Sequence, residues 1–141
     1  MTNLEFLQEW YRQVWIEGDP DAVDRFFLPR TGAQGLMPDG QVGPEDFKAL
    51  VPALRALVRN LDITVVRSLD FGEWIWAQIN VRAAMADSMR QIDASGQVTV
   101  RIVDGKITEA YNCFDFLTFF EQAGLLPENA FLLLLSSEKL G

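Results

Sequence analysis

The chain has 141 residues, a formal net charge of −8 and an apolar fraction of 49%, so it has the size of one domain that buries its own core. This acidic charge argues against a nucleic-acid interface, which needs a basic face, and against binding to an anionic membrane surface. The longest wholly apolar run, residues 130–135, is far too short to cross a bilayer.

The sequence contains no histidine and a single cysteine, Cys113. Without histidine, Ser-His and Cys-His catalytic arrangements are excluded, and most zinc or iron sites lose their usual ligand. No dinucleotide-binding, P-loop or EF-hand spacing is present, so we expect no cofactor and no metal. The acidic N-terminus lacks the basic segment of a secretion signal, so we expect a cytoplasmic protein.

Two helices are predicted in the N-terminal part of the chain. Thr2 and Glu5 form a capping box, apolar residues follow at helical spacing, and Gly18 ends this first helix. Asp19 then acts as a second cap, and Pro20 suits the first position of a short second helix.

A third helix begins at Gly43-Pro44, after a loop rich in glycine and proline. Pro52 falls inside this helix, where proline removes a backbone donor and clashes with the preceding turn. We therefore expect a kink or a fresh start near Pro52.

From Asp62 onward the pattern predicts strands: ITVVRSL, EWIWAQINVRAAM, QVTVRIV and KITEAYNCF, the last two joined by an Asp104-Gly105 turn. A last helix over 116–123 stops at Gly124. Helices followed by antiparallel strands predict an α+β domain over residues 1–141, with helices on one face of a curved sheet. The second strand has two alternating faces, one with Trp74, Trp76, Gln78, Asn80 and Arg82 and the other with Ile75, Ala77, Ile79 and Val81.

Four pieces of the sequence, in this order, resemble the SnoaL-like group of the nuclear transport factor 2-like superfamily. They are WYRQVWIEGDPDAVDRFF, GPEDFKALVPALRALVRNLDITV, VDGKITEAYNCFD and FFEQAGLLP. The resemblance implies a cone-shaped, cystatin-like roll, in which N-terminal helices close the concave face of a bent antiparallel sheet around a pocket. Relatives include polyketide cyclases, isomerases and epoxide hydrolases, so this fold does not specify a reaction.

The resemblance also implies where pocket residues lie. Against the limonene epoxide hydrolase branch, QGLMP puts Gln34 and Leu36 at a water-binding Tyr and Asn, and VRAAM puts Arg82 at the catalytic Arg. Ala84 and Asn112 stand where that branch has its two Asp residues, so only the arginine is kept. An amide has no useful acid–base pKa, so an Asp–Arg–Asp relay is not supported. SnoaL-type cyclases use a pocket Asp, and Asn112 is the position where we expect it to sit.

Candidate site residues follow from this comparison and from alternation. We take Asn112, Arg82 and Asp115 as catalytic candidates, although Asp115 is also well placed as the N-cap of the last helix. Asp39, Asp62 and Asp87 are alternative carboxylates that periodicity does not place inside the cone. The candidates for ligand binding are Gln34, Leu36, Trp15, Asn80 and Phe114, against the alternative that the aromatic residues form the core.

Two functions remain open from the sequence. One is an isomerase or cyclase acting on an apolar ring compound, and the other is a non-catalytic binding or dimeric module that has lost the acid. A carboxylate in the pocket favours the first, and a pocket of amides and aromatics favours the second. We also expect a homodimer, because the uncovered sheet face would carry one apolar alternating set, such as Ile75, Ala77, Ile79 and Val81 with Tyr111 and Cys113.

Overall fold

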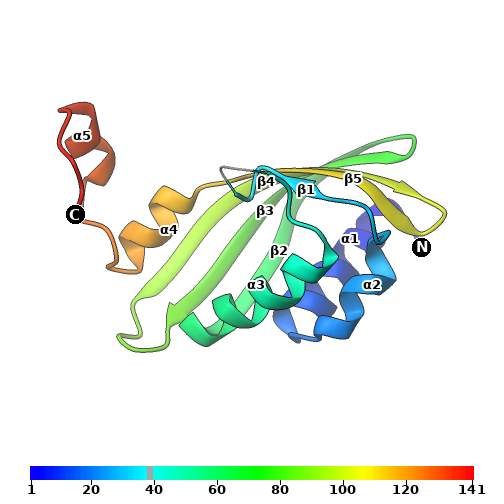
Figure 1. Ribbon diagram of the computed structural model, residues 1–141, viewed down its shortest axis with the longest axis horizontal. Coiled ribbons are helices and arrows are strands. Elements are labelled where there is room, and N and C mark those ends of the chain that lie inside the picture. Colours follow the sequence, from blue (N-terminus) through cyan, green and yellow to red (C-terminus); the bar gives the residue numbers. More distant parts are fainter. Residues whose placement is uncertain (38–39) are drawn as a thin grey trace.

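The computed structural model, which describes residues 1–37 and 40–141, is built on a bent five-stranded sheet with the order β1-β5-β4-β3-β2 (Figure 1). The long strands pair antiparallel, whereas β1 runs parallel to β5 and pairs Ala33 with Ala110. The strands are β1 (Ala33–Gln34), β2 (Val58–Phe71), β3 (Trp74–Met85), β4 (Gln91–Val103) and β5 (Lys106–Phe114).

Helices from the N-terminal part cover one face of this sheet (Figure 1). The expected capping box of Thr2 and Glu5 is confirmed, as is Pro20 in the first turn of its helix. Of the kink or fresh start expected near Pro52, the fresh start is absent, since one helix continues through that residue. These elements are α1 (Asn3–Trp10), the π-helix η1 (Tyr11–Ile16), the 3₁₀-helix η2 (Pro20–Ala22), α2 (Val23–Phe26) and α3 (Pro44–Leu57).

The two faces of β3 are distinct in burial. Ile75 and Ala77 are fully buried in the main core, under the helices. This corrects our expectation that this apolar set lies on the uncovered face, which instead carries the tryptophan set together with Tyr111 and Cys113. Strand alternation separates the two sets but does not reveal which one faces the helices.

A second, smaller core lies at the other end of the sheet. There α4 (Phe116–Gln122) places Phe119 against Met85 and Ile92. The short helix α5 (Ala130–Leu135) follows α4 and projects beyond the end of the sheet (Figure 1). No helix in the described part of the chain is both long enough and apolar enough to span a membrane.

Candidate functional site: an apolar cavity

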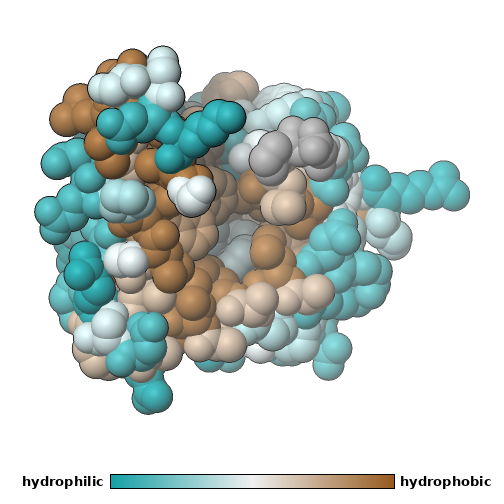
Figure 2. Space-filling model, turned by 60° about the vertical axis from the view of Figure 1, so that its left-hand side comes forward, coloured by the Kyte–Doolittle hydropathy of each residue, from teal (hydrophilic) through white to brown (hydrophobic). Residues whose placement is uncertain are grey.

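A cavity of about 620 Å³ lies between the concave face of the sheet, the N-terminal helices and α4. Figure 2 shows it as a hollow rimmed by apolar side chains. Its volume falls in the range of about 300 to 1,000 Å³ typical of small-molecule sites. Nine aromatic side chains contribute to its wall: Trp10, Tyr11, Trp15, Phe27, Phe47, Phe114, Phe116, Phe119 and Phe120.

The helical wall of the cavity is set by the π-helix η1. Trp10 and Trp15 meet Phe47 of α3 edge-to-face, with ring centroids 5.2 and 6.2 Å apart. Arg55, also on α3, donates hydrogen bonds to the backbone carbonyls of Trp15 and Ile16. A π-helix is rare and is often found at functional sites. Here it carries cavity residues, and Arg55 fixes its spacing from α3.

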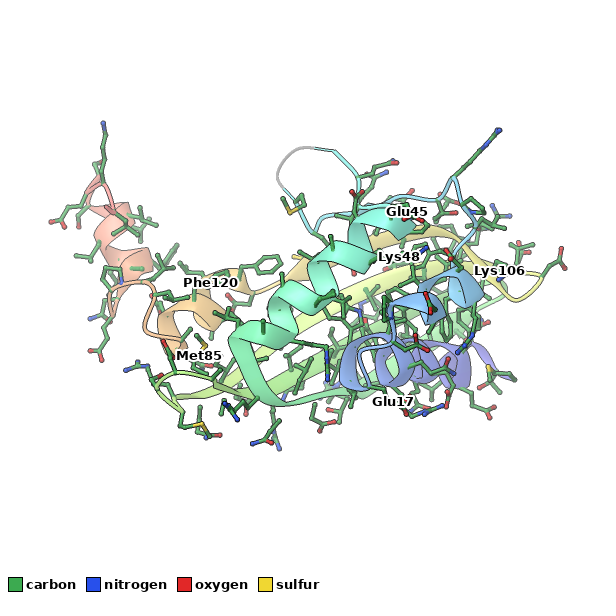
Figure 3. All side chains as sticks on the ribbon, turned by 60° about the horizontal axis from the view of Figure 1, so that its bottom comes forward. Glu17, Glu45, Lys48, Met85, Lys106 and Phe120 are labelled. Atoms are coloured by element: carbon green, nitrogen blue, oxygen red, sulfur yellow. The ribbon has the colours of Figure 1, made fainter. Side chains whose placement is uncertain are left out.

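The opposite wall at α4 follows from the aromatic run that begins at Phe116. Asp115 caps this helix by accepting hydrogen bonds from the backbone N–H and the hydroxyl of Thr118, at 3.0 and 2.6 Å. Phe120 lies on α4 and lines the cavity, whereas Lys48 lies between α3 and α2, with Glu45 nearby (Figure 3). Lys48 pairs there with Glu45 and Asp24 at 2.8 and 2.9 Å, so this charge stays away from the cavity.

Asn112 is the polar side chain that β5 contributes to the cavity. Its Nδ2 donates to the backbone carbonyl of Gln34 at 3.2 Å, across the pairing of β5 with β1. Gly35 makes this approach possible, because a Cβ at that residue would lie 1.8 Å from the Asn112 backbone oxygen. The side chain of Gln34 itself is exposed and does not line the cavity.

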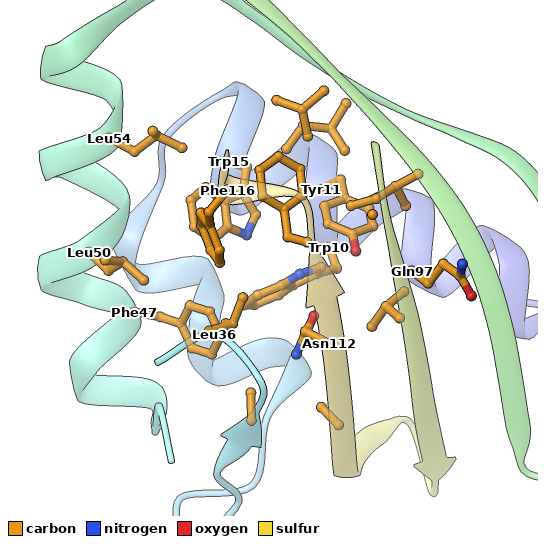
Figure 4. A pocket seen from close by; sticks show the side chains of 18 of the residues that line it. Trp10, Tyr11, Trp15, Leu36, Phe47, Leu50, Leu54, Gln97, Asn112 and Phe116 are labelled. Atoms are coloured by element: carbon orange, nitrogen blue, oxygen red, sulfur yellow. The ribbon is translucent and has the colours of Figure 1, made fainter. Parts of the chain in front are cut away.

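Tyr11 supplies a second polar group to the same space. Burial raises the pKa of its hydroxyl above the ordinary range, so the hydroxyl stays protonated. It makes no hydrogen bond to any described residue, and no buried side-chain oxygen or nitrogen in the described chain lacks a partner. Tyr11 lines the cavity, and Figure 4 shows its hydroxyl facing the same space as the Asn112 amide.

Arg82 does not join Asn112 in the cavity, which corrects our expectation from the family comparison. It lies on the outer face of β3, 70% exposed, with Nε 3.4 Å from a carboxylate oxygen of Asp93. Asn80 shares that outer face and is also outside the cavity wall, so its expected position as a ligand contact is wrong. Both belong to the strand set that points away from the helices.

No Asp, Glu, Lys or Arg side chain among the described residues lines the cavity. Asp115 is an exposed cap at the start of α4, and the alternatives Asp62 and Asp87 are also exposed. Asp39 lies outside the described residues. Gln97 borders the cavity, but its side chain accepts a 3.0 Å hydrogen bond from Trp76 on the outer face.

The structure brings four of the predicted site residues to the cavity, which are Asn112, Leu36, Trp15 and Phe114. Their roles in binding stay predictions. Tyr11 was not predicted as a polar wall residue, because its helical spacing also fits a core position. The α4 wall was not predicted either, although the aromatic run FLTFF was a signal for it.

A close contact between two strands lies in the sheet wall of the cavity. The ring of Phe114 rests against Gly96 of β4, where a Cβ would lie 2.7 Å from Phe114 Cδ2. Phe114 packs against both cores, and it meets Phe116 edge-to-face at 5.0 Å. The absence of a side chain at Gly96 thus leaves room for the ring of Phe114 in the cavity wall.

Comparisons with known proteins agree with this architecture. A comparison with curated protein sequences finds no match. A proposed polyketide cyclase from Bacillus cereus has a TM-score of 0.75 and 25% identity, over 85% of this chain and 78% of its own. One from Acidithiobacillus ferrooxidans has a TM-score of 0.74 and 20% identity, over 85% and 92%.

A Catenulispora acidiphila protein with a ketosteroid isomerase-like fold, solved in complex with trimethylamine, has a TM-score of 0.74 and 15% identity, over 88% of this chain and 95% of its own. These likenesses confirm the expected α+β fold. The family model of the SnoaL-like polyketide cyclases matches residues 5–123, which include every wall of the cavity. This chain belongs to the SnoaL-like polyketide cyclase family.

Proposed function

We propose that the protein binds an apolar ring compound in this cavity and does so without an acid–base carboxylate. The observation that carries the proposal is the composition of the wall, in which aromatic and aliphatic side chains surround the hydroxyl of Tyr11 and the amide of Asn112. Burial of a flat ring against such a wall is favourable, at roughly 25 cal/mol per Å² of apolar surface. Neither polar group is a general base at neutral pH.

A second candidate is an isomerase or cyclase that acts on the same kind of compound. Family membership and the unbonded Tyr11 hydroxyl favour it, since a neutral hydroxyl in an apolar site can stabilise negative charge on a ligand oxygen. Tyr11 would polarise the ligand, and Asn112 would orient it. The base would then have to come from outside the described cavity wall.

Binding is tested by titrating the protein with tetralin and 1-tetralone while tryptophan fluorescence is recorded, because Trp10 and Trp15 line the cavity. We expect saturable quenching in the wild type and its loss in Val98→Phe, which places a ring into the cavity from β4. Ser95→Phe is the matched control, because Ser95 is exposed on the outer face of the same strand. Equal quenching in all three proteins would contradict binding in the cavity.

Catalysis is tested separately by product analysis after incubation with ring compounds that carry an enolisable carbonyl. Asn112→Asp places a carboxylate at the position that our family comparison assigns to the cyclase acid. We expect turnover to appear or rise in this variant if the second candidate is right. Binding without turnover in both the wild type and Asn112→Asp would exclude the second candidate and support binding as the function.

A further inference from the structure

The C-terminal helix α5 is apolar on every side and has little cover. Its six residues, Ala130–Leu135, include no polar side chain. Only Ala130 is buried, and four others are between 45% and 66% exposed: Phe131, Leu132, Leu134 and Leu135. A helix that is apolar all round is normally buried, because moving its side chains out of water is favourable. In its described position α5 therefore presents an apolar surface without a partner.

The preceding helix, α4, is held on the sheet at both ends. At its start the Asp115 N–H donates to the Ser95 carbonyl of β4 at 3.1 Å. At its end Gln122 Oε1 accepts a 2.7 Å hydrogen bond from the Asp93 N–H, and the Gln122 carbonyl accepts one from Arg90 Nε at 2.8 Å. A displacement of α4 would break these bonds, so we place any movement of α5 in the connection that follows α4.

That connection has the features of a hinge. Gly124 and Asn129 have φ values of +80° and +62°, so a left-handed residue stands at each end of it. The Ala130 N–H donates to Glu121 Oε1 at 2.8 Å, and this is the one hydrogen bond between α4 and α5 in the part of the chain that the structure describes. A hinge needs only a few residues that absorb a change in backbone angles. Few contacts therefore oppose a rotation of α5.

The open side of the cavity lies within reach of α5. Phe116 lines the cavity from α4 and is 40% exposed, and Ala53 lines it from α3 and is also exposed, so the cavity is open to solvent at this edge. Figure 2 shows apolar side chains around this hollow. The N–H groups of Leu125 and Leu126 bond to the carbonyl of Phe120, a cavity residue. Even if those bonds persist, residues 127–129 extend to about 10 Å and α5 adds about 9 Å.

We propose, on the basis of the binding function above, that α5 is a lid that turns about residues 127–129 and covers the mouth of its own chain's cavity. Neither α5 nor the cavity wall among the described residues carries a charged side chain, so closure brings two apolar surfaces together and removes both from water. The match to the family model ends at residue 123, before this lid.

The short connection favours the chain's own cavity over that of a second copy. A segment on a short tether meets a site in the same molecule at an effective concentration on the order of millimolar. A second copy at micromolar concentration competes poorly with that. Closure therefore regulates the cavity within one chain, and its expected effect is slower exchange of a bound ligand.

Disulfide formation tests the closed position without any ligand. In a Cys113→Ser background, which removes the free cysteine, the mouth pair combines Leu132→Cys with Ala53→Cys. The control pair combines Leu132→Cys with Ala56→Cys, because Ala56 is exposed on α3 but does not line the cavity. A disulfide needs Cα atoms within about 7 Å, so we expect the intramolecular bond of the mouth pair to form about tenfold faster than that of the control pair.

Ligand release tests the consequence of closure. Tetralin is bound, and its release is followed by tryptophan fluorescence in a stopped-flow instrument. We expect the oxidised mouth pair to release tetralin about tenfold more slowly than the same protein after reduction, because differences in binding appear mainly in the dissociation rate. Leu132→Glu should release tetralin faster than the wild type, since a charged side chain on α5 opposes closure over an apolar mouth.

The outcomes separate the lid from the binding function. If tetralin does not bind, the binding function is overturned, and the disulfide rates alone decide whether α5 closes. A covalent dimer on a non-reducing gel would overturn the lid and assign α5 to a second copy. Equal disulfide rates in the two pairs, or unchanged tetralin release from the oxidised mouth pair, would also overturn it.

Discussion

The carboxylate of Asp115 illustrates how one residue can suggest chemistry and yet serve structure. It is exposed, and it bonds both the backbone N–H and the hydroxyl of Thr118 in the first turn of α4. We predict that Asp115→Ala lowers the free energy of unfolding by about 1 kcal/mol, the usual value for a lost N-cap, and leaves ligand affinity unchanged. Chemical denaturation and the tetralone titration measure the two effects.

Asp115→Asn is the control, since asparagine caps a helix about as well as aspartate. A loss of turnover in a stably folded Asp115→Ala protein would reverse this assignment and make Asp115 an acid of the site.

The Tyr11 hydroxyl affects how the free energy of unfolding changes at alkaline pH. Burial raises the pKa of its hydroxyl above the value of about 10 for an exposed tyrosine. Above pH 10 the unfolded chain has released this proton while the folded chain still holds it, so the free energy of unfolding falls as pH rises, by about 1.4 kcal/mol per pH unit. Below that pH both states hold the proton, and Tyr11 adds no pH dependence.

We therefore expect Tyr11→Phe to lose stability less steeply than the wild type between about pH 9 and pH 11, by chemical denaturation. Tyr111→Phe is the comparison: its hydrogen bond to Glu109 also raises the pKa of Tyr111, but this side chain is exposed, so we expect a smaller change of slope than in Tyr11→Phe. Identical slopes in Tyr11→Phe and the wild type would show that the Tyr11 hydroxyl is not buried as described.

Residue alternation explains which site residues could be predicted. On β5 it correctly placed Asn112 and Phe114 on one face and Tyr111 and Cys113 on the other. On β3 alternation separated two sets but did not show which set faced the helices. Arg82 was therefore predicted to face the cavity from the family comparison alone. Side chains alternate with a period of two residues whether the polar set or the apolar set faces the helices, so the period alone does not identify the inner face.

At the scale of elements, the junction of η1 and α3 depends on Gly18 and Arg55. Gly18 has a φ of +73°, and a Cβ there would lie 2.2 Å from Arg55 Nε. We predict that Gly18→Ala lowers the free energy of unfolding by about 1 to 3 kcal/mol, from left-handed strain and from displacement of Arg55 off the Trp15 and Ile16 carbonyls. Thermal denaturation measures the loss.

Gly105→Ala is a matched control, because Gly105 also has a φ of +73° but no neighbour within 4 Å of an added Cβ. The difference between the two variants isolates the contact with Arg55. Equal losses would show that the contact contributes nothing beyond backbone strain.

The ends of helices and strands could be predicted where glycine or proline residues mark a turn or a helix start, and not elsewhere. The Asp104-Gly105 turn and the Gly43-Pro44 start appear as expected. Strand β4 begins at Gln91, earlier than the expected start at residue 97. The early part was not predicted because Ala94 and Gly96 carry little of the apolar signal that marks a strand. The π-helix was not foreseen, since apolar spacing does not distinguish it from an α-helix over one turn.

At the scale of the whole molecule, the outer sheet face carries an apolar patch of Leu69, Phe71, Trp74, Trp76 and Tyr111. Leu69 is 66% exposed, and the ring of Trp74 stacks on Phe71 and on Tyr111 at 6.3 and 6.4 Å. We propose that a second copy of the chain covers this patch. The dimer stays a prediction, and on β3 the tryptophan set takes the place of the expected Ile75, Ala77, Ile79 and Val81 on this face.

We predict a homodimer by sedimentation velocity at micromolar concentration, and a monomer for Leu69→Glu, which adds like charges across the interface. Leu125→Glu is the control, because Leu125 is 58% exposed after α4 and outside the patch. A monomeric wild type would refute the dimer. Dissociation by Leu125→Glu alone would move the interface to the C-terminal end.

The contact between Gly96 and Phe114 has a consequence for how such a cavity can diverge. Any side chain at residue 96 must displace the Phe114 ring, because the Cβ would meet it at 2.7 Å. The polar groups of Tyr11 and Asn112 do not depend on that contact, so mutation at a single codon would resize the cavity and keep its hydrogen-bond pattern. Selection can then change the width of the accepted ring system separately from its functional groups.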